Sequence, residues 1–476
     1  MQMRIGGAEI PAAEDLWMPV INPATGGEID RVPRGSAAEV DLAVQTARQA
    51  LGGWGKKTVR ERGMVLFRAA HLVREEHEAL ARTLTTEQGK PFREATDEIR
   101  GFANILEFYA GISAGIQGEL LRLGGLGDCL VTHEPLGVCG AIVPWNMPAL
   151  IMGWKVGPAL LAGNTMVFKP ASQTPLTALY LAGLMEHAGL PPGVLNLVTG
   201  TGDVVGEAIA RHPDIAKISF TGDAATGYRV RELAGHGLKA VTLELGGSDP
   251  MIVWKDADLE KAVTGAVRGR FYNAGQTCTA VKRLFVHQSV ATEFMRLLVA
   301  RVKALKVGNG MDPAVDMGPL AGKVQQERII SLMEDVQVRG EGKVSTGGYV
   351  PKEGDLVRGY YYAPTIVTDP HPGSSLLCGE VFGPVLPVTC IPDLDAAISQ
   401  ANQTPYGLGA SIWTKDLEVV KEVFSRVDAG VVWVNRHLTI PPELPFGGVK
   451  GSGIGRENGV SAYLSHTRSK SLFLGW

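Results

Sequence analysis

The sequence is poor in cysteine, has no long apolar run and carries little excess charge. Only five of its 476 residues are cysteines, and no two have the spacing of metal ligands, so neither a disulfide framework nor a zinc site is expected. No run of about 18 apolar residues predicts a membrane span, and the N-terminus lacks a signal-peptide core. A formal net charge of −3 argues against nucleic acid or an anionic membrane as partner. These absences predict a soluble, cytoplasmic protein without a bound metal.

The chain has the composition of an ordinary globular protein, with 45% hydrophobic and 20% charged residues. Its length suggests about three domains of roughly 150 residues each. Strand-like and helix-like runs alternate over residues 136–243 and again over 250–446, which predicts parallel βαβ units with ligands at the carboxyl ends of the strands. Residues 1–35 look irregular. Residues 467–474 read as a lone strand that needs a partner edge, on another subunit if not within the chain.

Cys278 stands at a junction between a helix-like run, 259–270, and a strand-like run, 283–287. A turn at this point would hold the thiol toward whatever lies beyond it, so we interpret Cys278 as a nucleophile. Taken alone, it is better explained as a buried structural cysteine, because free cysteines are among the most buried residues.

Three further groups are candidates for chemistry. Glu244 ends a strand and precedes two glycines, so it is a possible general base, although alone it reads as a surface ion-pair residue. Asn146 lies between two prolines that stiffen its turn, so its amide suits an oxyanion hole, although alone it reads as an Asx-turn residue. Glu380 is a carboxylate close to an aromatic residue, Phe382, and alone this pair is only weak evidence of a functional site.

Together these groups resemble the aldehyde dehydrogenase superfamily, in its hydrolytic NAD(P)-dependent branch, over essentially the whole chain. The resemblance implies a Rossmann-like cofactor domain (1–117 and 136–246), an α/β catalytic domain (247–450) and a small β oligomerisation element (118–135 and 459–476). It also implies a homodimer or homotetramer. The segments that carry it, in the order of the family, are 144–148, 169–172, 220–222, 244–247, 275–278, 380–384, 445–448 and 451–457.

The resemblance implies a role for each group. The Cys278 thiolate attacks an aldehyde, Asn146 and the Cys278 backbone N–H hold the oxyanion, Glu244 activates the water that hydrolyses the thioester, and Lys155 supports them. Lys282 and Arg283 read as solvated or structural. The residues that match the family's cofactor site are Pro144, Trp145, Lys169, Ser172, Gly202, Phe220, Thr221, Gly222, Asp223, Leu245, Glu380 and Phe382.

Two positions depart from the family pattern. Asp223 stands where most members have serine, and its charge is unhelpful beside a pyrophosphate. No glutamate follows Ala462 and Tyr463, where many members carry a proton relay.

The resemblance also bears on cofactor choice. Ser172 stands where NAD-preferring members commonly have a glutamate that repels a 2′-phosphate, and Lys169 adds positive charge. This pattern favours NADP or dual use, with NAD as the alternative.

The resemblance places mostly apolar side chains around the aldehyde, with residues 436–440 near the tunnel mouth. Arginines that grip succinate semialdehyde in relatives are absent at Trp154 and Tyr272, so an apolar aliphatic or aromatic aldehyde is predicted. A longer carboxylated aldehyde, held by Arg436 and His437, stays open, as does a non-catalytic binding protein; Glu244 argues against a CoA-acylating enzyme. The predicted substrate residues are Met147, Leu150, Ile151, Trp154, Tyr272, Thr277, Thr279, Arg436 and Phe446.

Overall fold

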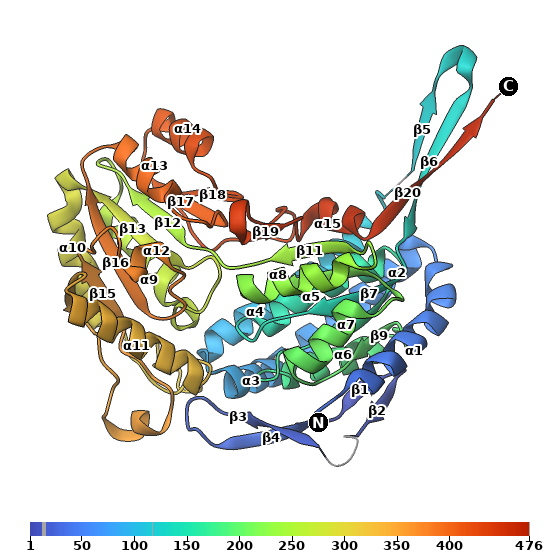
Figure 1. Cartoon of the computed structure of the whole chain (residues 1–476), viewed down its shortest axis with the longest axis horizontal. Coiled ribbons are helices and arrows are strands. Elements are labelled where there is room, and N and C mark those ends of the chain that lie inside the picture. The colour runs from blue at the N-terminus through green and yellow to red at the C-terminus, as the bar shows by residue number, and fades with distance from the viewer. Residues whose placement is uncertain (12–15, 117, 476) are drawn as a thin grey trace.

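A computed structural model describes residues 1–11, 16–116 and 118–475 of the chain. It shows two lobes, each built on a large β-sheet, and a small sheet that projects from one of them (Figure 1). This architecture confirms the predicted mixed α/β class with parallel strands. The division into domains by residue number stays a prediction.

The first lobe contains an eight-stranded sheet in the order β19-β11-β10-β7-β8-β9-β1-β2. Its five central strands are parallel, and antiparallel strands close both edges. The central strands are nearly all buried, as expected for a sheet covered on both faces. The strands are β1 (Met3–Ile5), β2 (Ala8–Ile10), β7 (Val138–Ile142), β8 (Thr165–Lys169), β9 (Leu195–Leu197), β10 (Ile215–Thr221), β11 (Ala240–Glu244) and β19 (Gly453–Ile454).

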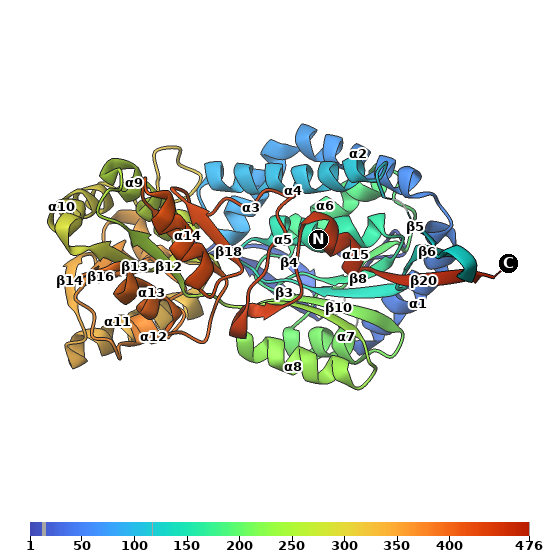
Figure 2. The same ribbon diagram turned by 90° about the horizontal axis from the view of Figure 1, so that it is seen from above.

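Helices cover both faces of this sheet, and two apolar clusters fill the space between (Figure 2). One cluster packs three helices on one face: α1 (Ala37–Gly55), α7 (Glu207–Arg211) and α8 (Ala224–Gly235). Capping boxes begin α1 at Ser36 and α2 at Thr58, which explains where these helices start. The other cluster packs α2 (Val59–Glu75), α3 (His77–Gln88), α4 (Phe92–Ile112), α5 (Pro148–Leu161) and α6 (Leu176–His187).

The second lobe contains a seven-stranded sheet in the order β14-β15-β16-β13-β12-β17-β18. All its pairs are parallel except β14 with β15. The strands are β12 (Asp249–Val253), β13 (Val281–His287), β14 (Lys343–Thr346), β15 (Thr365–Thr368), β16 (Val385–Ile391), β17 (Gly409–Trp413) and β18 (Val431–Val434). The helices are α9 (Leu259–Phe271), α10 (Gln288–Lys303), α11 (Lys323–Arg339), α12 (Ser375–Cys378), α13 (Leu394–Asn402) and α14 (Leu417–Arg426).

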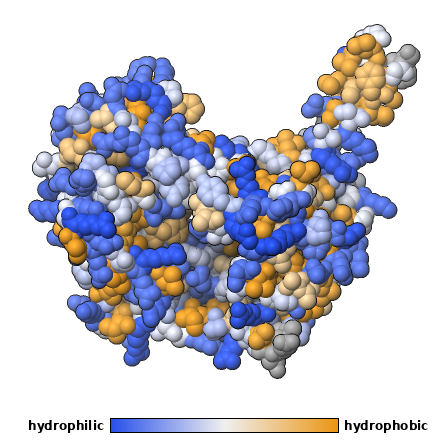
Figure 3. Space-filling model, in the orientation of Figure 1, coloured by the Kyte–Doolittle hydropathy of each residue, from blue (hydrophilic) through white to orange (hydrophobic). Residues whose placement is uncertain are grey.

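The projecting sheet, which we call the arm, consists of β5 (Glu119–Arg122), β6 (Asp128–Pro135) and β20 (Thr467–Leu474). The C-terminal strand has the predicted bounds but finds its partner within the chain, since β20 pairs with β6 from Thr467–Pro135 to Leu474–Asp128. The short helix α15 (Gly459–Ser465) leads into it. Apolar side chains cover the arm (Figure 3).

The prediction of an irregular N-terminal stretch was wrong. Residues 1–35 contain four strands: β1, β2, β3 (Trp17–Ile21) and β4 (Glu28–Pro33). β1 pairs with β9 through Arg4 and Leu197, so its partner lies far away in the sequence. β3 and β4 form a hairpin in which β3 is apolar throughout, so it lacks the alternation that predicts a half-buried strand. Among the described residues, no helix is long and apolar enough to cross a membrane.

Candidate active site

A cleft of about 590 Å³ lies between the two lobes. One wall comes from the ends of β7, β8, β10 and β11, and the other from Cys278, α11 and the segment after α12. The carboxyl ends of parallel strands are the usual position for a ligand in such a fold. All the residues matched to a cofactor site line it: Pro144, Trp145, Lys169, Ser172, Gly202, Phe220, Thr221, Gly222, Asp223, Leu245, Glu380 and Phe382.

Cys278 reaches this cleft because the chain makes an unusual turn after α9. Asn273, Ala274 and Gly275 have φ angles of 52°, 53° and 75°, so three successive residues adopt the left-handed conformation. A Cβ on Gly275 would lie 2.3 Å from the Gly383 carbonyl oxygen, so only glycine fits there. The backbone N–H of Asn273 donates to the Glu94 carboxylate (2.8 Å), which fixes the turn against α4.

The Cys278 thiol is in an environment that disfavours its thiolate. Burial first, and then three carboxylates, on Asp249, Glu244 and Glu380, raise its pKa to about 12. The Lys282 ammonium is the group that opposes them. The thiol of the resting enzyme is therefore protonated at neutral pH.

Lys282 is buried, so of the two alternatives, solvated or structural, the structure favours the structural one. Its ammonium donates to three oxygens: the carbonyls of Gly247 (2.8 Å) and Cys278 (2.8 Å) and the Glu380 carboxylate (2.6 Å). These acceptors use all three N–H groups of a lysine. Lys282 thus ties the nucleophile loop to both flanks of the cleft. Arg283 is also buried and donates to backbone carbonyls, which fits a structural role.

Asn146 lies beside Cys278 on the wall of the cleft. Its Nδ2 donates to the Gln276 carbonyl oxygen (2.9 Å), which leaves one amide hydrogen for another acceptor. The backbone carbonyl oxygen of Asn146 accepts from Lys90 Nζ (2.8 Å) and Asn273 Nδ2 (2.9 Å). These bonds fix the Asn146 amide in position, as a donor of an oxyanion hole requires.

Glu244 ends β11 and is only 3% exposed. Among the described residues, neither of its carboxylate oxygens has a hydrogen-bond partner. Burial, and then Glu457, raise its pKa well above the ordinary value. It does not line the cleft itself; its Oε1 would be 2.6 Å from a Cβ on Gly447.

A second carboxylate near Glu244 was missed by the sequence analysis. Glu457 is buried and forms an ion pair with Lys155 (2.5 Å), which is also fully buried. Lys155 therefore has a buried acidic partner, although no glutamate follows Tyr463. No sequence signal predicted this pair, because its members are 302 positions apart.

The cofactor side of the cleft has one surprising feature, Asp223. Its carboxylate accepts hydrogen bonds from both the backbone N–H (2.9 Å) and the hydroxyl (2.6 Å) of Thr226, and so caps α8. Its charge is thus directed at the helix start. Ser172 donates to the Gly200 carbonyl oxygen (3.0 Å), and burial lowers the pKa of Lys169 to about 8.

The rest of the cleft fits a dinucleotide. Trp145 and Phe382 meet edge to face, with ring centroids 5.5 Å apart, and the Glu380 carboxylate lies against Gly246, where a Cβ would be 2.1 Å from Oε2. Four residues of α11 that also line the cleft were missed, because their spacing is that of any amphipathic helix: Gln325, Arg328, Ile329 and Leu332.

The predicted substrate side chains form an apolar wall next to Cys278. Trp154 and Phe446 lie with ring centroids 5.1 Å apart in an apolar cluster that also touches the cysteine. Tyr272 and Thr277 come from the nucleophile loop, and the Tyr272 hydroxyl reaches the Glu94 carbonyl oxygen (3.5 Å). The wall, as we use the term, consists of Met147, Leu150, Ile151, Trp154 and Phe446.

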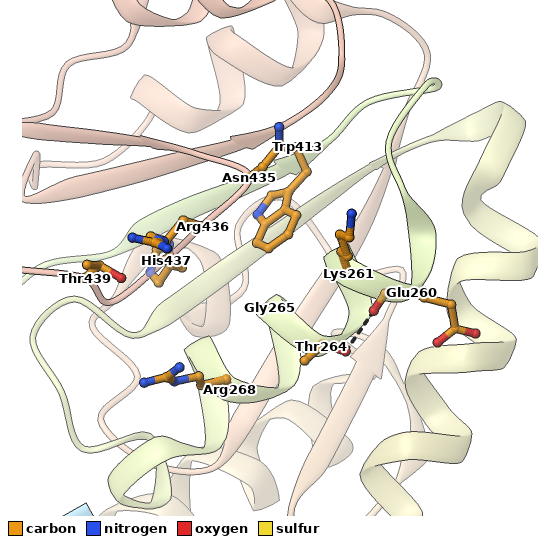
Figure 4. Close-up of a pocket in the computed structure, with 10 residues that line it drawn as sticks. All are labelled: Glu260, Lys261, Thr264, Gly265, Arg268, Trp413, Asn435, Arg436, His437 and Thr439. Atoms are coloured by element: carbon orange, nitrogen blue, oxygen red, sulfur yellow. Dashed lines mark hydrogen bonds between the residues drawn. The ribbon is translucent and has the colours of Figure 1, made fainter. Parts of the chain in front are cut away.

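Arg436 lies elsewhere, in a second pocket between α9 and the segment after β18 (Figure 4). His437 shares this pocket and connects it to the nucleophile loop, since its Nε2 contacts the Thr279 carbonyl oxygen (2.7 Å). Burial lowers the pKa of His437 to about 4, so this imidazole is neutral at physiological pH. No group of three or more His, Cys, Asp or Glu side chains among the described residues is arranged to hold a metal ion.

Comparison with known proteins agrees with this geometry. The sequence profile of the aldehyde dehydrogenase family matches residues 10–472. Betaine aldehyde dehydrogenase from Brucella anthropi is 40% identical over 471 residues, covering 99% of this chain and 96% of that protein.

Two crystal structures are close in fold. Betaine aldehyde dehydrogenase from Staphylococcus aureus, in complex with NAD+, superposes with a TM-score of 0.96 at 34% identity, over 99% of this chain and 94% of the other. An E. coli enzyme described as NADP dependent has a TM-score of 0.97 at 37% identity, over 100% and 98% of the two chains. This chain is therefore an enzyme of the aldehyde dehydrogenase family, whose members use NAD or NADP.

Proposed function

We propose that the enzyme oxidises an apolar aldehyde to its carboxylic acid and releases the acid by hydrolysis. The observation that carries this proposal is that Cys278 and Asn146 meet at the inner end of a dinucleotide-sized cleft, beside an apolar wall. Hydrolysis needs a base for water. Glu244 is one of the carboxylates close enough to raise the pKa of the thiol, and both its oxygens lack a hydrogen-bond partner among the described residues.

The reaction begins at Cys278. Its thiol releases its proton to solvent in the cleft and the sulfur attacks the aldehyde carbon, whose C=O π electrons move to the oxygen and form the oxyanion of a thiohemiacetal. The remaining Asn146 amide hydrogen and the Cys278 backbone N–H stabilise the oxyanion. Loss of hydride from the same carbon leaves a thioester on Cys278.

Glu244 then acts on water. A carboxylate whose pKa is raised by burial is a better base at neutral pH than an ordinary one. It takes a proton from the water that attacks the thioester, and the acid leaves as the thiol re-forms. The buried ion pair of Lys155 and Glu457 also affects the pKa of Glu244, which Glu457 raises and Lys155 lowers.

NAD(P), when bound, accepts the hydride. Glu380 lines the cleft and would accept hydrogen bonds from ribose hydroxyls, and Phe382 with Trp145 would pack beside the flat rings. The start of α8 at Gly222 and Asp223 would hold the pyrophosphate. Ser172 supports NADP or dual use, because it adds no charge that would repel a 2′-phosphate.

The aldehyde panel that tests this function compares kcat/KM with NAD and with NADP. Medium-chain aliphatic and aromatic aldehydes should exceed succinate semialdehyde, because the wall offers no cation to a short carboxylate. Betaine aldehyde belongs in the panel because two relatives are named for it. Ser172→Glu should move preference toward NAD. Succinate semialdehyde ranking first, or NAD preferred at least tenfold by the parent enzyme, would count against the assignment.

We also infer that the arm mediates a homodimer or homotetramer. It exposes a set of large apolar side chains that a monomer would leave in water, and its outer strands have open edges. The exposed set is Leu120, Leu121, Leu123, Leu126, Leu130, Leu472 and Phe473.

A further inference from the structure

The pocket of Figure 4 measures about 540 Å³ and contains none of the catalytic or cofactor-site residues described above, although Arg436 was predicted to be a substrate residue. Helix α9 forms one side, with Lys261, Thr264 and Arg268. The ends of β17 and β18 form the other, with Trp413 and Arg436. Figure 4 shows the Arg268 and Arg436 side chains on the same side of the pocket.

Two guanidinium groups in this pocket have no counter-ion. Within residues 1–11, 16–116 and 118–475, neither Arg268 nor Arg436 forms an ion pair or a side-chain hydrogen bond, and both are exposed. The other charged groups there are engaged elsewhere. Lys261 pairs with Asp258 (3.2 Å), and Glu260 pairs with Arg301 (3.4 Å). The pocket therefore presents unneutralised positive charge.

Trp413 supplies a second, independent sign of a ligand. Its side chain is only 5% exposed, and its Nε1–H has no acceptor among the described residues. The ring lies against Gly265, where a Cβ would be 2.2 Å from the indole, so α9 leaves room for it there. A buried N–H without an acceptor costs free energy, which a bound acceptor would recover.

Both walls of the pocket continue toward the nucleophile loop and the apolar wall beside Cys278. On α9, the Arg268 carbonyl oxygen accepts from the backbone N–H of Tyr272, one helical turn closer to the nucleophile loop. On the other side, Thr439 lines the pocket and the next residue, Ile440, packs against the cluster that contains the apolar wall. His437 spans the two through Thr279.

We propose that this pocket is the outer part of the substrate site and binds a carboxylate at the far end of a long aldehyde. The inference rests on the proposed function, because it gives that aldehyde its distal group. Two guanidinium groups suit a carboxylate, and an indole N–H adds a neutral donor. A four-carbon semialdehyde is too short to reach past the apolar wall, whereas a longer one buries its methylene chain there and its charge at the arginines.

The test uses two matched series of aldehydes with four to twelve carbons. One series ends in a carboxylate and the other in its methyl ester. The parent enzyme should prefer the acid over the ester, by tenfold or more in kcat/KM, only above a threshold length. Raising NaCl from 50 to 500 mM should reduce this preference, since exposed charges are screened.

Three variants address the residues directly. Arg268→Gln and Arg436→Gln should each lower the acid-to-ester ratio about tenfold, mainly through KM for the acid. Trp413→Phe, which keeps the ring and removes the N–H, should lower it several-fold. Arg231→Gln, an exposed arginine on α8 far from the pocket in the chain's fold, is the control and should leave the ratio unchanged.

Either of two results would overturn the inference: an acid-to-ester ratio within twofold of unity at every length, or a ratio that Arg268→Gln and Arg436→Gln both leave unchanged. These failures are distinct from failure of the proposed function. If the esters are oxidised and the acids are not preferred, only the carboxylate subsite is wrong. If no aldehyde of either series is oxidised, the function itself is wrong.

Discussion

Lys282 is the residue that connects the nucleophile loop to the cofactor side of the cleft. Lys282→Met keeps the length of the side chain but removes the ion pair of Glu380, which retains only the Gly247 backbone N–H as donor, and the ammonium donor of two carbonyls. We expect a loss of roughly 3 kcal/mol in the free energy of unfolding, as for one broken buried ion pair. Urea denaturation measures this loss.

The double variant Lys282→Met/Glu380→Gln is the matched control for charge. It removes the unpaired carboxylate as well, so it should recover part of the stability. If Lys282→Met unfolds at the same urea concentration as the parent, the three contacts do not stabilise the protein.

The raised pKa of the Cys278 thiol can be tested by its rate of alkylation at different pH values. Because burial raises the thiol pKa to about 12, the thiolate fraction should increase about tenfold per pH unit throughout the accessible range. Without cofactor, the rate of Cys278 alkylation by iodoacetamide should therefore rise about 100-fold from pH 7 to pH 9. Mass spectrometry assigns the label, with Cys278→Ala as the control. A rate that reaches a plateau below pH 8 would show a lowered pKa and contradict this expectation.

At the level of single residues, the sequence predicted which residues lie close together when each belongs to a short, ordered motif. Cys278 and Asn146 do meet, because each motif also specifies its own turn. The sequence did not predict contacts made by single residues across the fold. The carboxylate partners of Lys282 and Lys155 lie 98 and 302 positions away, so neither local spacing nor composition could have predicted them.

The start of α8 carries Asp223, one of the two positions at which the sequence is interpreted as departing from the family pattern. Asp223→Ser keeps an efficient helix cap but removes the negative charge from the expected pyrophosphate position. We expect the KM for NAD(P) to fall three- to tenfold, corresponding to about 1 kcal/mol at a helix terminus. The stability should change little.

Asp223→Ala serves as the comparison, since it removes charge and cap together and should cost about 1 kcal/mol of stability. Initial-rate kinetics and thermal unfolding separate the two effects. An Asp223→Ser variant with an unchanged or higher KM would mean that this carboxylate does not face the cofactor.

Elements with buried apolar runs were predictable, and short edge elements were not. The strands from β7 to β11 alternate with helices as the apolar pattern indicates, because both faces of a parallel sheet must be covered. By contrast, β1 and β2 have three residues each, and they exist only because the first sheet offers β9 as an edge.

At the scale of the whole molecule, the arm should determine the assembly. Replacing two of its exposed apolar side chains, Leu120→Lys with Phe473→Lys, places charge where a partner subunit would pack. We expect the molar mass measured by light scattering to fall toward that of the monomer. Phe424→Lys, on equally exposed α14, should leave the mass unchanged. Identical masses for all three proteins would exclude the arm as the interface.

The central claim is that Cys278 forms a thioester that Glu244 then helps to hydrolyse, and rapid mixing of Glu244→Gln with aldehyde and NAD(P) tests it most directly. The account predicts a burst of reduced cofactor close to one equivalent per active site. A steady state slower than that of the parent, by about 10²- to 10⁴-fold, should follow, because water lacks its base. Cys278→Ala should give neither phase. A Glu244→Gln variant without a burst, or with the steady-state rate of the parent, would contradict the account.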